Sequence, residues 1–172
     1  MTGISRTRAV AAAIAMLAVA AALSAGQSNS AANQQVADVK EVHDYQLTMD
    51  KLNRFENAAK AVKKILAENP SAQQKLDSDS QNSAGPNSFA QSAAAIDKQP
   101  QLTAAIKASG FTTHEYIVIT YALMASESYV DMKKSNPNTP MPAYVSPANA
   151  AFAEANFARI QALGPTLSGS SN

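Results

Sequence analysis

The sequence contains no cysteine and no tryptophan, and only 6% of its 172 residues are aromatic. Without cysteine the chain forms no disulfide, no thiolate nucleophile, no cysteine-ligated zinc or iron–sulfur site and no covalent c-type haem attachment. The same absence excludes a lipoprotein anchor on cysteine. Glycine is also scarce, and no alternating apolar runs are joined by Asn-Gly or Asp-Gly, so the sequence gives strands little support.

Hydrophobic residues make up 46% of the chain, but much of that fraction is alanine. An alanine-rich chain with few glycines favours helices that pack closely together over a sheet. We therefore expect an all-α protein. Its length is sufficient for one domain with a modest core.

The charges are nearly balanced, with 14 Lys and Arg against 13 Asp and Glu. Nucleic-acid binding depends on clustered basic side chains that displace counterions. The densest basic group consists of Lys60, Lys63 and Lys64, and its spacing is typical of a solvated helix face. We therefore expect no nucleic-acid partner.

Residues 1–26 have the pattern of a secretory signal peptide. Arg6 and Arg8 supply the positive start, and Ala9 to Leu23 supply a short apolar segment before small residues suited to cleavage. The alternative is an uncleaved anchor, but a bilayer span needs about 20 apolar residues. We expect cleavage, export to the periplasm or the medium, and no stable membrane span afterwards.

The rest of the chain divides by composition. Residues 27–41 are rich in Ser, Asn, Gln and Ala without apolar periodicity, which predicts a disordered leader. Deletion of residues 27–40 is expected to change the stability by less than about 0.5 kcal/mol. Residues 42–164 form the predicted helical domain, and the Ser-rich residues 165–172 a disordered tail.

The most apolar stretch runs from Phe111 to Lys134, and Thr120 is the one polar residue within Tyr116–Ala125. Such a run is too short to cross a bilayer but suits a helix that other helices surround. Thr112 and Glu115 have the spacing of a capping box at its start.

We expect a small single-domain bundle of five or six helices around a central helix at about 112–134. The segment 77–87 contains Gly-Pro among polar residues and predicts a loop, and 135–147 holds four of the 8 prolines and predicts an extended crossover. The other predicted helices are 45–69, 88–99, 100–109 and 147–163, with a short helical turn at 71–76.

The two histidines are the first candidates for a metal site. His114 falls in the first turn of the central helix, and His43 lies at the edge of the leader. Neither has a second histidine at the three- or four-residue spacing of a zinc pair. We take His114 as the candidate metal ligand, beside the alternative of an ordinary surface residue.

Methionines offer a second route to a metal. Exported methionine-rich proteins bind copper(I), and Met124 and Met132 share a helix face. Some exported haem bundles use a methionine near the first helix and a histidine in the last helix. This sequence does not fit that arrangement, because its last predicted helix has no histidine. Filling of the core explains the methionines better, and we expect no cofactor. The methionines considered are Met49, Met124, Met132 and Met141.

Glu127 interrupts the second half of the central helix. It could line a ligand pocket with Tyr121, Met124 and Tyr129, or face solvent, and the pattern favours solvent. Neither a GxSxG nor an SxxK motif occurs, and paired carboxylates at an acid–base spacing are absent from the sequence. The protein is therefore expected to lack enzymatic activity, although a hydrolase of unfamiliar type that uses Glu127 or Glu115 stays an alternative.

Three segments, YQLTMDKLNRFENAAKA, SGFTTHEYIVITYALMAS and YVSPANAAFAEAN, together resemble a group of small exported all-helical bacterial proteins. That group carries Y-x-L-T-x-x-K, GLT-x-x-E-Y and SP-x-N-x-x-F segments at similar intervals. The resemblance covers about Tyr45 to Leu163 and implies one exported helical domain. It implies no activity, cofactor or catalytic residue.

The sequence thus predicts an exported, non-enzymatic binding module for a protein partner or a small apolar ligand. A metal- or haem-binding bundle that uses His114, His43 and the methionines is the alternative.

Overall fold

A computed structural model describes residues 28–81 and 88–164. The predicted signal peptide, the tail and the Gly-Pro part of the predicted loop lie outside these residues. Within the described residues the protein is entirely helical and has eight helices, so the expected all-α class is confirmed. None of the described helices combines the length and the apolar character needed to cross a membrane.

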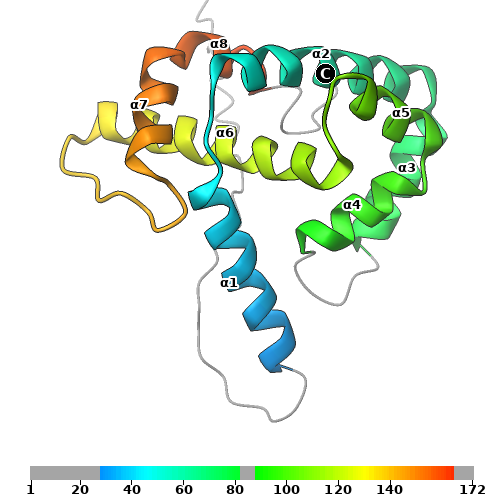
Figure 1. Cartoon of the computed structure of the whole chain (residues 1–172), viewed down its shortest axis with the longest axis horizontal. Helices are drawn as coiled ribbons and strands as arrows, with labels where there is room; N and C mark the ends of the chain where they lie inside the picture. Colours follow the sequence, from blue (N-terminus) through cyan, green and yellow to red (C-terminus); the bar gives the residue numbers. More distant parts are fainter. Residues whose placement is uncertain (1–27, 82–87, 165–172) are drawn as a thin grey trace, which may run out of the picture.

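The helix predicted at 112–134 is α6, and it crosses the middle of the molecule in Figure 1. It contacts α4 and α5 near its start, α7 and α8 near its end, and α1 on a further side. The helices are α1 (Ser28–Asp44), α2 (Met49–Glu68), α3 (Pro70–Gln81), α4 (Phe89–Asp97), α5 (Pro100–Ala108), α6 (Thr113–Ser135), α7 (Pro147–Ala155) and α8 (Phe157–Gln161).

Local hydrogen bonds set several of the helix starts. The Thr112 hydroxyl accepts from the Glu115 N–H at 3.0 Å, as the spacing predicts. The Glu115 carboxylate does not complete the predicted capping box, because it accepts from the Tyr45 hydroxyl at 3.0 Å instead. A full capping box forms at α4, where the Ser88 and Gln91 side chains satisfy each other's backbone N–H groups.

The main core contains buried residues of α2 and α6 together with others from α1, α4, α5, α7 and α8. Phe55 is fully buried and stacks on Tyr116, with ring centroids 5.3 Å apart. Ile119 and Leu123 continue the buried stripe one and two turns further along α6. Gly110, between α5 and α6, has φ of 83°, which an L side chain rarely adopts, and its carbonyl accepts from Arg54 at 3.0 Å.

The buried side chain of Asn149 joins the start of α7 to the link between α1 and α2. Its carboxamide oxygen accepts from the Leu47 N–H at 3.0 Å, and its nitrogen donates to the Tyr45 carbonyl at 2.6 Å. Tyr45 also binds Glu115 through its hydroxyl. Three segments far apart in the sequence therefore meet in one hydrogen-bonded network around Tyr45, Glu115 and Asn149.

The prediction of a disordered leader at 27–41 is wrong for residues 28–41, which belong to α1. Val42 is buried in the core, and Asp38 accepts from the Phe89 N–H at 3.0 Å. The polar contacts that join α1 to α4 and α6 lie in its second half, at Asp38 and Glu41, and they need no apolar stripe. This explains why hydrophobic periodicity does not reveal it.

Two other boundaries differ from the prediction. The helix after Pro70 continues to Gln81, so residues 77–81 are helical and not loop. The helix predicted at 147–163 is interrupted at Asn156, whose side chain donates to the Phe152 carbonyl at 2.8 Å. An asparagine that binds a backbone carbonyl competes with regular helix geometry, and here it separates α7 from α8. The number of helices is therefore larger than the five or six expected.

Candidate functional site

The four predicted ligand residues of α6 do not come together in one pocket. Side chains two residues apart on a helix point to nearly opposite sides, which separates Glu127 from Tyr129. Tyr121 is 48% exposed, whereas Tyr129 is 5% exposed. Met124 and Glu127 are half-buried. Of the four, only Tyr129 lines the groove described below.

Tyr121 belongs to a cluster of rings between α4 and α6. Its ring centroid lies 4.8 Å from that of Phe89, and the His114 ring meets Phe89 edge-on at 6.5 Å. Phe89 is itself buried. The contacts in this cluster hold α4 against the first half of α6.

Each histidine is paired with one carboxylate. His114 Nε2 lies 2.9 and 3.0 Å from the two carboxylate oxygens of Glu41 on α1, and His43 Nδ1 lies 2.9 Å from Asp44. Among the described residues, no three His, Cys, Asp or Glu side chains come close enough to hold a metal ion. The described surroundings of His114 thus provide a docking contact for α1.

Glu127 lies in a partly desolvated position on α6. Burial raises the pKa of the Glu127 carboxyl, and repulsion from Asp131 adds to this, while Lys134 acts in the opposite direction. A raised pKa suits a general acid or base, but it also arises wherever a carboxylate is partly covered by its neighbours. Glu127 does not line the groove described next.

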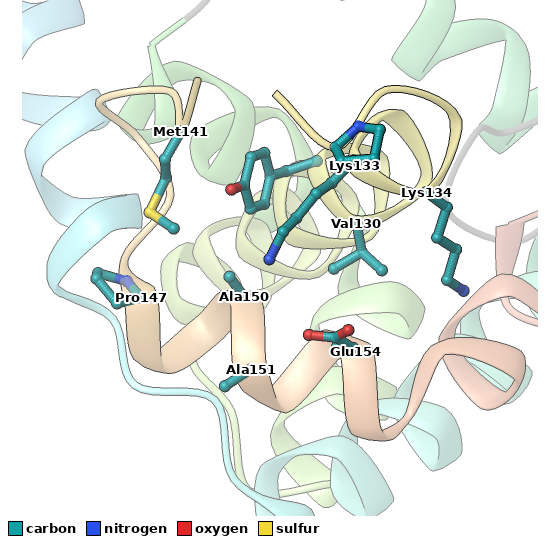
Figure 2. Close-up of a pocket in the computed structure, with 10 residues that line it drawn as sticks. Val130, Lys133, Lys134, Met141, Pro147, Ala150, Ala151 and Glu154 are labelled. Atoms are coloured by element: carbon teal, nitrogen blue, oxygen red, sulfur yellow. The ribbon is translucent and has the colours of Figure 1, made fainter. Parts of the chain in front are cut away.

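A groove with a volume of about 380 Å³ lies between the last turns of α6, the crossover and α7 (Figure 2). Ligand pockets commonly have volumes of about 300–1,000 Å³. Most of the lining is apolar, and three charged side chains stand among it. The groove is lined by Tyr129, Val130, Lys133, Lys134, Pro137, Met141, Pro147, Ala150, Ala151 and Glu154.

The floor of the groove is a small second core. Tyr129, Val145 and Ala150 are buried against one another, apart from the main core. The Ser146 hydroxyl accepts from the Asn149 N–H at 3.2 Å and starts α7, and a turn in which the Val145 N–H donates to the Pro142 carbonyl at 3.0 Å precedes it. These local bonds fix the end of the crossover against α6.

Met141, exposed on the crossover, overhangs one end of the groove (Figure 2). Lys133 extends from α6 toward α7, and Glu154 projects from α7 toward α6. Lys134 is occupied differently, since its ammonium group lies 3.1 Å from the centroid of the Phe157 ring. Lys133 and Glu154 have no ion-pair partner among the described residues.

No sequence motif marks the groove as a site. Met141 is one of several methionines, and Lys133 and Glu154 resemble ordinary charges in the last turns of helices. The available signal is the proline-rich crossover, which predicts a semi-rigid strap beside the end of α6. The pairing of that strap with α7 depends on tertiary contacts.

No protein-family model matches the chain, and no curated protein or solved structure matches it significantly.

Proposed function

We propose that this protein is a non-enzymatic binding protein whose groove between α6, the crossover and α7 holds a small, largely apolar ligand. The groove itself carries this proposal, because its volume and its mostly apolar lining suit such a ligand. Its floor is a packed cluster, and prolines stiffen its crossover wall. These features favour a preformed site.

The proposal includes export. Arg6 and Arg8, the apolar segment that follows them and the small residues after it support passage through a secretory pathway to the periplasm or the medium. We further propose that α6 acts as the central helix of a bundle. Its contacts with α1, α4, α5, α7 and α8 support this arrangement.

Native mass spectrometry of the protein purified from its own host tests the proposal. Ala151 is exposed and lines the groove, so Ala151→Trp places a large ring there without disturbing the buried core. Ala148 is exposed on the same helix and does not line the groove, so Ala148→Trp is the matched control. We expect a bound mass on the wild type and on Ala148→Trp, and its loss from Ala151→Trp.

Circular dichroism of both variants verifies that they fold. A wild-type protein that carries no added mass in repeated preparations would contradict small-ligand binding and direct the search to a protein partner. A bound mass that survives Ala151→Trp would place the ligand elsewhere on the molecule.

A further inference from the structure

We propose that the ligand of this groove is a short zwitterionic peptide with apolar side chains, its ammonium group at Glu154 and its carboxylate at Lys133. This inference depends on the proposed binding function and specifies the class of ligand. It follows from the charges that stand among the apolar lining.

Glu154 is the negatively charged residue of the groove lining. It lies in the last turn of α7, where the helix dipole disfavours a negative charge, and it is exposed. A carboxylate at this position does not help the helix, and no ion pair with another described residue compensates for it. Its projection toward α6 makes it available to a cationic group in the groove (Figure 2).

Lys133 supplies the opposite charge from the facing wall. Its neighbour Lys134 contacts the Phe157 ring, which leaves Lys133 as the lining cation without a described partner. Two opposite charges on facing walls select a ligand that carries both signs. A fatty acid would leave Glu154 uncompensated and be repelled by it, and a polyamine would be repelled by Lys133 in the same way.

The rest of the groove is mostly apolar. Its lining includes Val130, Tyr129 and Ala151. Met141 covers one end with a flexible, polarizable side chain that adapts to different shapes. A ligand that spans the two charged walls must therefore present apolar groups between its own charged ends. A short peptide of apolar residues has this distribution of charge, whereas a free amino acid carries both charges on one carbon.

Isothermal titration calorimetry with trileucine tests the proposal, using the full mature protein. Acetylation of the peptide removes its ammonium group, and amidation removes its carboxylate. We expect the wild-type protein to bind each modified peptide about fivefold more weakly than trileucine, because exposed ion pairs are weak. We expect Glu154→Gln and Lys133→Met each to bind trileucine about fivefold more weakly than the wild type does. Acetylation of the peptide should not weaken its binding to Glu154→Gln any further. Amidation should likewise not weaken its binding to Lys133→Met any further.

Lys63→Met and Glu68→Gln, exposed charges of α2 that do not line the groove, should bind trileucine as the wild type does. If acetylation of the peptide lowers its affinity for Glu154→Gln as much as its affinity for the wild type, the losses are additive. That result would overturn the assignment of the ammonium group to Glu154. Equal or tighter binding of free leucine would overturn the peptide class.

The two proposals fail in different ways. A bound mass that Ala151→Trp removes, together with no binding of trileucine, would overturn the peptide inference and leave the binding function standing. No bound mass and no peptide binding would overturn both.

Discussion

The carboxamide oxygen of Asn149 lies 3.0 Å from the backbone nitrogen of Leu47, which joins two residues 102 positions apart in the chain. Asn149 is 2% exposed, and its nitrogen also satisfies the Tyr45 carbonyl. One buried side chain thus pairs the Leu47 N–H and the Tyr45 carbonyl, two backbone groups of the irregular link between α1 and α2. The polar residues of the resembling segments serve the architecture here.

Replacing Asn149 should be costly. Asn149→Ala leaves the Leu47 N–H and the Tyr45 carbonyl without their partner, and each unsatisfied buried group costs about 1–3 kcal/mol. We expect urea denaturation to show a loss of about 2–4 kcal/mol in the free energy of unfolding. Asn57→Ala, at an exposed position of α2, should change it by less than about 0.5 kcal/mol. Equal effects of the two variants would refute the structural role of Asn149.

The contact between Asp38 and α4 makes α1 part of the folded domain. Asp38→Ala removes the acceptor of the Phe89 N–H, which lies at the start of α4. We expect a loss of about 0.5–2 kcal/mol in the free energy of unfolding, as for other lost caps. Hydrogen exchange should become faster at the Phe89 amide in this variant. Unchanged exchange there would show that α1 does not dock on α4 in solution.

Tyr116 should make the fold sensitive to alkali. Burial raises the pKa of Tyr116 to about 12, above the value of about 10 that it has in an unfolded chain. The unfolded state therefore loses this proton first, so the stabilising contribution is complete below pH 10 and is lost as pH rises toward 12.

Between these limits the free energy of unfolding should fall by about 1.4 kcal/mol per pH unit from this group alone. Tyr116→Phe should remove this contribution of about 1.4 kcal/mol per pH unit, because Phe has no proton to lose. Urea denaturation at a series of pH values measures the slope. Identical slopes for the two proteins would contradict the burial of an un-ionised Tyr116.

The pair of Glu56 and Arg159 should have the opposite pH dependence. Arg159 donates to the Glu56 carboxylate through two nitrogens, at 2.5 and 2.8 Å, and this hydrogen bonding lowers the pKa of Glu56. A lowered pKa gives stability above the unfolded value of about 4.3, and that stability is lost as pH falls through the folded value.

Glu56→Gln should therefore lower the urea midpoint at pH 7, and the difference from the wild type should shrink below pH 4. A constant difference across this pH range would indicate that packing, and not charge, links α8 to α2.

The helix starts depend most directly on local sequence. The predicted N-cap at Thr112 is confirmed, and the structure has further N-caps at Thr48, Ser88 and Ser146, a proline at the start of α5 and a positive φ at Gly110. Each depends on hydrogen bonds or steric limits within a few residues, so neighbouring sequence is sufficient to specify it. The apolar run of α6 likewise predicts its burial.

What the sequence determined by itself is the all-α class and most helix boundaries. Tertiary structure decided the docking of α1 and the position of the groove. Contacts between distant residues produce both: Asp38 with Phe89, and the crossover with α6 and α7. A site formed where separate segments meet has no fixed spacing in the chain, so periodicity and motifs do not reveal it.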